Sequence, residues 1–215
     1  MITAIWIAMI VIALGAAVFI GWRYASRRQS LPCPTWLAWM VEMDNPFTAT
    51  NRAATIVDHL ELKRGMRVLD VGCGPGRVTL PVARKIGPDG EVVAIDMQSG
   101  MLARVKERAA AANLKNIRYV QRAIGVDALD VQPADRALLV TVLGEIPDRE
   151  SALRAIFGAL KPGGFLSITE IVFDPHYQRR STVTQLALGA GFQVKAFFGG
   201  RLAYTLHLSK PGVKR

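Results

Sequence analysis

An acid and three glycines at close spacing are the first residues in this chain whose pattern indicates chemistry. Asp70 stands two residues before Gly72 in the run RVLDVGCGPGRVTL, which extends from Arg67 to Leu80. The glycines at 72, 74 and 76 permit a tight turn and let a ligand lie directly against the main chain. A helix that begins after this turn offers free N–H groups. The pattern therefore predicts a nucleotide-type ligand at a strand-to-helix turn.

A second acid, Asp96, ends the next predicted strand, which covers residues 91–95, and lies 24 residues beyond Gly72. An acid in this position can accept hydrogen bonds from both ribose hydroxyls of an adenosine. The alternative is that Asp96 caps the following helix, but Ser99 is available for that role.

The glycine spacing distinguishes between ligands. A dinucleotide fingerprint requires G-x-G-x-x-G, and here Arg77 occupies the third glycine position. The G-x-G-x-G spacing with its preceding acid resembles motif I of the class I S-adenosylmethionine-dependent methyltransferases. Leu160 to Phe165 (LKPGGF) resembles the L-x-P-G-G turn before the fifth strand of that family, and the resemblance covers roughly residues 51–210. A dinucleotide site and a purely structural turn remain the alternatives.

The resemblance implies S-adenosylmethionine as the cofactor and a set of residues that would bind it. After the third predicted strand the family places an adenine contact, for which Ala123 and Ile124 fit and Asp127 is a displaced acidic candidate. The complete predicted cofactor set is Asp70, Gly72, Cys73, Gly74, Gly76, Asp96, Met97, Ala123, Ile124 and Thr141.

Three residues near the ends of the later strands are candidate catalytic bases: Glu145, His176 and Tyr177. A phenol, thiol or protonated amine needs a base to become a nucleophile. Ordinary alternatives are a loop-fixing contact for Glu145 and a structural or surface position for His176. Arg179 and Arg180, which precede a predicted helix, suit an anionic group on the acceptor.

The elements that must position these residues alternate between strands and helices. Beyond the strands at 67–71 and 91–95, strands are predicted at 116–121, 135–143 and 165–171, with a terminal hairpin at 193–198 and 202–208. A helix is predicted to begin at Asn45 and Pro46. The expected fold is α/β, a seven-stranded, mostly parallel, doubly wound sheet with an antiparallel last strand, as the resemblance implies.

The N-terminal segment predicts a different environment. Residues 1–22 of the 215 carry no charged side chain, Arg23, Arg27 and Arg28 follow, and the net charge is +10. About 20 apolar residues span a bilayer. We therefore expect a transmembrane signal anchor at 1–22, a basic juxtamembrane and interfacial segment at 23–50, and a methyltransferase domain at 51–215. A cleaved signal peptide is the alternative. The predicted localisation is a single-pass membrane protein with a cytoplasmic catalytic domain.

The expected partners are a lipophilic or lipid substrate and the anionic head groups of a bilayer, with no nucleic acid and no metal. The predicted function is methyl transfer from S-adenosylmethionine to a lipid-phase acceptor of the phospholipid-amine or quinol type, in general similarity to ubiquinone/menaquinone-type and phospholipid methyltransferases. Alternatives are a small lipophilic thiol or phenol, a membrane-associated protein, and a binding scaffold that has lost chemistry. The oligomeric state is not predicted.

Overall fold

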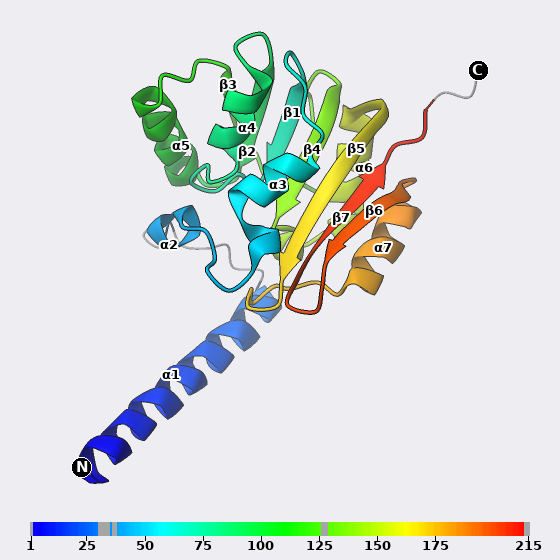
Figure 1. The fold of residues 1–215 in the computed structure, drawn as a ribbon. Helices are drawn as coiled ribbons and strands as arrows, with labels where there is room; N and C mark the ends of the chain where they lie inside the picture. Colours follow the sequence, from blue (N-terminus) through cyan, green and yellow to red (C-terminus); the bar gives the residue numbers. More distant parts are fainter. Residues whose placement is uncertain (1, 30–34, 36–37, 126–128, 213–215) are drawn as a thin grey trace.

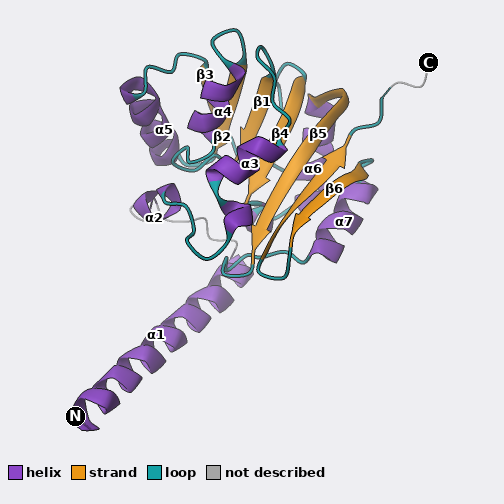
Figure 2. Cartoon of the chain, in the orientation of Figure 1, coloured by secondary structure: helices purple, strands orange, loops and turns teal. Residues whose placement is uncertain are grey.

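A seven-stranded sheet forms the centre of the molecule, with helices on both faces (Figure 1, Figure 2). The computed structural model describes residues 2–29, 35, 38–125 and 129–212. The strand order is β3-β2-β1-β4-β5-β7-β6. The strands are β1 (Arg67–Val71), β2 (Glu91–Asp96), β3 (Ile117–Gln121), β4 (Ala134–Val140), β5 (Leu160–Ile171), β6 (Gln193–Gly199) and β7 (Ala203–Ser209).

The strand directions agree with the predicted sheet. β1 to β5 pair in parallel, and β7 runs antiparallel to both of its neighbours, β5 and β6. β1 is buried from Val68 to Val71 and β4 from Ala137 to Leu139, as expected for central strands covered on two faces. The change of direction on the two sides of β1 brings the carboxyl ends of β1, β2 and β4 to one crevice, where ligands bind in open α/β sheets.

Two apolar clusters cover the two faces of the sheet. One contains side chains from α3 (Ala53–His59), α4 (Thr79–Ile86) and α5 (Ser99–Ala111). The other contains side chains from α6 (Arg149–Ala159) and α7 (Arg180–Gly189). The apolar residues recur at helical spacing, for example Leu153 and Ile156 on α6, so each helix presents one face to the core.

Several predicted boundaries differ from the observed ones. β4 ends at Val140 instead of residue 143, because Thr141 has φ +56° and turns the chain into a short 3₁₀ helix, η3 (Leu143–Glu145). No helix begins at Asn45, whose Oδ1 accepts a hydrogen bond from the Phe47 N–H in a local turn. Helix formation starts later, with the 3₁₀ helix η2 (Ala49–Asn51) and then α3. The predicted turn at 160–165 lies within the long strand β5.

The N-terminal segment forms helix α1 (Ile2–Gln29), which extends away from the sheet in Figure 1. To cross a bilayer, a helix needs about 20 consecutive, mostly apolar residues. Among the residues that the structure describes, no helix is both long enough and apolar enough to do so. The predicted localisation, a single-pass membrane protein with a cytoplasmic catalytic domain, is therefore wrong. Part of the predicted juxtamembrane and interfacial segment at 23–50 lies outside the described residues; its first residues belong to α1, and α2 (Ala38–Glu42) forms within it.

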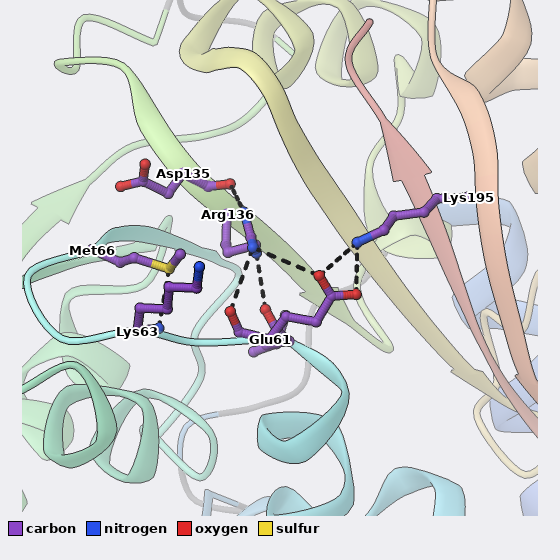
Figure 3. A network of polar contacts seen from close by, with 7 residues as sticks. Glu61, Lys63, Met66, Asp135, Arg136 and Lys195 are labelled. Carbon is purple, nitrogen blue, oxygen red and sulfur yellow. Dashed lines mark hydrogen bonds and ion pairs between the residues drawn. The ribbon is translucent and has the colours of Figure 1, made fainter. Parts of the chain in front are cut away.

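A network of polar contacts lies at the amino ends of the strands (Figure 3). This end of the sheet is opposite the crevice formed by the carboxyl ends of β1, β2 and β4. Glu61 accepts hydrogen bonds from Lys195 Nζ at 2.6 and 2.7 Å and lies 3.9 Å from an Arg136 nitrogen. The hydrogen bond from Lys195 lowers the pKa of Glu61. Asp135 accepts from the Arg67 N–H and from Lys161 Nζ. Because these charges are already paired with one another, the network is structural in character.

Candidate functional site

A pocket of about 400 Å³ lies at the carboxyl ends of β1, β2 and β4. Its walls come from the glycine loop after β1, the end of β2, the segment after β3, η3 and the loop after β5. The lining residues are Val41, Asp70, Val71, Gly72, Cys73, Gly74, Pro75, Arg77, Val78, Asp96, Met97, Gln98, Met101, Arg122, Ala123, Ile124, Val140, Thr141, Val142, Glu145, Ile146, Pro147, Asp174, Pro175 and His176.

Two of the three glycines of the loop, Gly74 and Gly76, have different tasks. All three have positive φ, a conformation that other residues rarely adopt. A Cβ on Gly74 would meet a single atom within 4 Å, on Val41, so this part of the main chain is open to a ligand. A Cβ on Gly76 would come within 2.8 Å of Leu80, so Gly76 serves packing against the helices and does not line the pocket.

Asp96 presents a carboxylate to the pocket. It is 8% exposed, its Oδ2 accepts from the Gly74 N–H at 2.9 Å, and its Oδ1 accepts from the Gln98 N–H at 2.9 Å. Each oxygen can accept a second hydrogen bond. Burial raises the pKa of Asp96, and its backbone hydrogen bonds oppose that effect. The carboxylate therefore fits a ligand with two neighbouring hydroxyls, such as the ribose of an adenosine.

Asp70 joins two elements of the fold beneath the glycine loop. Its Oδ2 accepts a hydrogen bond from the Thr79 hydroxyl at 2.5 Å, which ties β1 to the first turn of α4. Burial, with a further contribution from the charge of Asp96, raises the pKa of Asp70 to about 6, against the effect of the Thr79 hydrogen bond. Cys73 also lines the pocket, and because burial raises the pKa of its thiol, this side chain stays neutral.

The remaining predicted cofactor residues lie around the same space. Met97 is 55% exposed at the pocket wall, while Ile124 is buried. Ala123 lines the pocket beside Ile124 and offers an apolar surface for a planar ring. The alternative acid, Asp127, lies outside the described residues.

Two carboxyl groups and an imidazole, those of Glu145, Asp174 and His176, lie close together in the pocket wall after β4 and β5. His176 Nδ1 lies 3.8 Å from Glu145 Oε1 and 3.9 Å from Asp174 Oδ1. Burial raises the pKa of Glu145 to about 8, and the charges of Asp174 and Asp96 add to this effect. A carboxyl whose pKa lies near neutral pH is suited to proton transfer.

The methyltransferase-domain model matches residues 62–197, which contain the glycine loop, Asp96, Glu145 and His176. The match covers more than half of the chain. The chain belongs to the methyltransferase-domain family. This membership confirms the predicted enzyme class, a methyltransferase, and with it S-adenosylmethionine as the cofactor.

Curated relatives of this methyltransferase domain are named as methyltransferases of ubiquinone/menaquinone biosynthesis or of demethylmenaquinone. The ubiquinone/menaquinone biosynthesis C-methyltransferase UbiE of Idiomarina loihiensis is 33% identical over 115 residues, covering 53% of this chain and 46% of the relative. The demethylmenaquinone methyltransferase of Staphylococcus carnosus is 33% identical over 133 residues, covering 57% of this chain and 53% of the relative. The chain therefore spans about half the length of the curated relatives it matches.

Solved structures with the same fold include a SAM-dependent methyltransferase from Aquifex aeolicus. It superposes with a TM-score of 0.72 at 19% identity and covers 82% of this chain and 98% of its own. The [4+2]-cyclase SpnF superposes with a TM-score of 0.66 at 18% identity, and the superposition covers 74% of this chain and 80% of SpnF. Because a cyclase shares the fold, the fold alone does not define the reaction.

Most of the residues predicted for the site of this methyltransferase domain lie together, and two do not line the pocket. Gly76 faces the packed helices, as described above. The Tyr177 ring packs against Tyr204, with ring centroids 6.3 Å apart, and joins the apolar cluster under α6 and α7. A hydrogen bond from its own N–H to the Asp174 carbonyl turns the chain there, so that His176 faces the pocket and Tyr177 faces the core.

Sequence reasoning did not anticipate the tasks of Arg77 and Val41. Arg77 Nη1 donates to Asp44 Oδ1 at 2.8 Å and to the Asn51 carbonyl at 2.6 Å, which draws the segment after α2 toward the glycine loop. Val41 of α2 then lies beside Gly74, with one methyl carbon 3.9 Å from the position that a Cβ on this glycine would take. The available signal was the arginine that occupies the third glycine position, but its partners lie 26 and 33 residues away in the chain.

Proposed function

We propose that this domain transfers the methyl group of S-adenosylmethionine to a lipophilic acceptor that binds beside Glu145 and His176. The observation that carries the proposal is that one pocket joins two sets of groups. The glycine loop and Asp96 come from the carboxyl ends of β1 and β2, and Glu145, Asp174 and His176 come from the segments after β4 and β5. A cofactor and an acceptor held in such a pocket would be close enough for in-line transfer.

The cofactor would be held by groups at the carboxyl ends of β1, β2 and β3. Asp96 would accept hydrogen bonds from the ribose hydroxyls, while the open main chain at Gly74 would allow the ligand to approach closely. Met97, Ala123 and Ile124 would contact the adenine. S-adenosylmethionine supplies an electrophilic methyl group, so the chain's own residues need to align the partners and exclude water.

On the acceptor side, Glu145 would take up the proton that the acceptor loses as its nucleophilic atom bonds to the methyl carbon. A hydroxyl or an activated ring carbon is compatible with this step. His176 would stand beside the carboxyl, 3.8 Å from its Oε1, and would help to orient it. The acceptor class therefore includes phenols and quinols.

An apolar acceptor is supported by the surface next to this wall. Phe173, directly before the pocket residue Asp174, is 48% exposed, and Phe47 is 80% exposed. Their ring centroids lie 6.4 Å apart. Met97 and Val41 add exposed apolar surface to the pocket wall. The quinone-biosynthesis names of the curated relatives agree with an acceptor of this type.

The test is transfer of radiolabelled methyl from S-adenosylmethionine to three kinds of acceptor: an alkyl-substituted hydroquinone, a lipophilic thiol and a mixture of proteins. We expect label in the hydroquinone. Label in the thiol or the protein alone would identify the other acceptor classes. Binding of S-adenosylmethionine without transfer to any of them would contradict the proposed reaction and favour a binding scaffold.

A further inference from the structure

We propose that Glu170, a buried residue of β5 outside the pocket wall, is a positioning residue that holds the loop carrying Asp174 and His176 in its working place. The inference rests on the proposed function, because this loop would form the acceptor side of the site. Glu170 is 1% exposed and is not among the residues that line the pocket.

The first observation is a clamp on the backbone of Gln178. Glu170 Oε2 accepts a hydrogen bond from the Gln178 N–H at 3.0 Å. The Tyr204 hydroxyl donates to the Gln178 carbonyl at 2.8 Å. The two polar groups of one peptide residue are thus held by β5 and by its antiparallel neighbour β7.

The clamp is connected to the pocket by hydrogen bonds within the loop. Gln178 Nε2 donates to the His176 carbonyl at 2.7 Å. The His176 N–H donates to Asp174 Oδ1 at 2.7 Å. Moving Gln178 would therefore move His176, and with it the groups that lie beside Glu145.

The loop is also enclosed from the other side. A Cβ on Gly144 would overlap the His176 carbonyl, so η3 lies directly against the loop. Arg149 donates to the Leu143 carbonyl at 3.1 Å and to the Gly144 carbonyl at 3.0 Å, which holds η3 in place. His176 therefore lies between a fixed η3 and the clamp from Glu170.

The ionisation of Glu170 fits this task. Burial, with contributions from Asp174 and Glu145, raises its pKa to about 8, while the Gln178 hydrogen bond and Arg149 lower it. Its other oxygen, Oε1, has no hydrogen-bond partner among the described residues. Because Glu170 is mainly a neutral acid at pH 7, glutamine is a close substitute that keeps the carbonyl oxygen needed by Gln178.

The test compares Glu170→Ala with Glu170→Gln in the full chain. The alanine variant should lower kcat roughly 10- to 100-fold, the scale of a misplacement of about 1 Å in a reacting group. Its affinity for S-adenosylmethionine, measured by calorimetry, should be unchanged, because the groups proposed to contact the cofactor lie at the carboxyl ends of β1, β2 and β3 and not on β5. Glu170→Gln should restore most of the rate. Tyr204→Phe, which removes the second half of the clamp, should lower kcat by a smaller factor.

Hydrogen exchange tests the clamp without requiring an acceptor. The Gln178 amide should exchange roughly tenfold faster in Glu170→Ala, because it loses its acceptor, and near the wild-type rate in Glu170→Gln. If the wild-type protein methylates nothing, the proposed function fails while this measurement still tests the clamp.

Thr169→Val is the matched control. It removes a buried hydrogen bond, Thr169 to Thr205 at 2.8 Å, from the residue next to Glu170 and on the opposite face of the strand. Equal losses of kcat in Thr169→Val and Glu170→Ala would overturn the inference in favour of general destabilisation. Unchanged Gln178 exchange in Glu170→Ala would overturn it as well.

Discussion

At the scale of the residue, the chemistry depends on the protonation of Glu145. Burial raises its pKa to about 8, and only the ionised carboxylate accepts a proton. We therefore expect kcat/KM to rise with pH toward a plateau above about pH 8. Glu145→Gln should lower kcat by about 10²–10⁴-fold and remove this rise, because the amide accepts no proton. The measurement is the pH–rate profile of both proteins.

Glu150→Gln provides a control of the same chemical change. Glu150 is exposed and pairs with Arg154 on the surface of α6, at 3.4 Å. Exposed pairs contribute little, so this variant should follow the wild-type profile. A Glu145→Gln enzyme with the wild-type rate would assign proton transfer to another group, and His176 would be the next residue to test.

At the scale of the element, the segment from α2 to η2 (residues 38–51), here called the strap, lies beside the glycine loop. Hydrogen bonds from Arg77 hold it there. Arg77 is largely buried and bonds to both Asp44 and Asn51. Arg77→Ala should weaken the affinity for S-adenosylmethionine about tenfold, because the segment that carries Val41 would no longer be held beside Gly74 and the buried Asn51 would lose its hydrogen-bond donor. Calorimetry measures the affinity, and limited proteolysis near residue 44 reports the release of the strap.

The strap offers its own comparison at Arg104, whose Nε donates to Glu42 at 2.7 Å from a more exposed position. Exposed ion pairs typically contribute about 0–1 kcal/mol. Arg104→Ala should therefore bind the cofactor almost as the wild type does. An equal loss of cofactor affinity in both variants would mean that overall charge governs binding, and not the hydrogen bonds from Arg77 to Asp44 and Asn51.

At the scale of the whole molecule, His207 links the stability of the sheet to pH. It is fully buried on β7, stacked on Phe165 with ring centroids 4.5 Å apart, and neither ring nitrogen has a hydrogen-bond partner among the described residues. Burial, with the nearby charge of Lys195, lowers its pKa to about 4. Because the unfolded chain binds a proton near pH 6.5, the stability contribution is present above that pH and is lost as pH falls toward 4.

His207→Leu should therefore flatten the acid side of the stability curve. The relative gain over the wild type between pH 6.5 and pH 4 should be at most about 3 kcal/mol, the size of the pKa difference. Thermal unfolding of both proteins across this range measures it. A constant difference in Tm at every pH would show that His207 does not titrate in this window.

The sequence by itself determined the positions of β1 and β2, the glycine turn after β1 and the place of Asp96 at the end of β2. These features depend on short buried runs and on backbone angles that glycine supplies, both of which are local properties. β1 and β2 accordingly occupy almost the predicted residues. The helix expected at Asn45 was wrong because a side-chain hydrogen bond to Phe47 stabilises a turn in that place.

Only the tertiary structure decided which polar groups act together. Tyr177 follows His176 directly in the chain, yet it packs in the core while His176 lies in the pocket with Glu145, 31 positions away. Arg77 reaches Asp44 across 33 positions, and Tyr204 meets Gln178 across 26. Such contacts depend on the order and register of strands, because these bring distant segments to the same edge of the sheet. Residue types and spacing along the chain carry no direct record of that order.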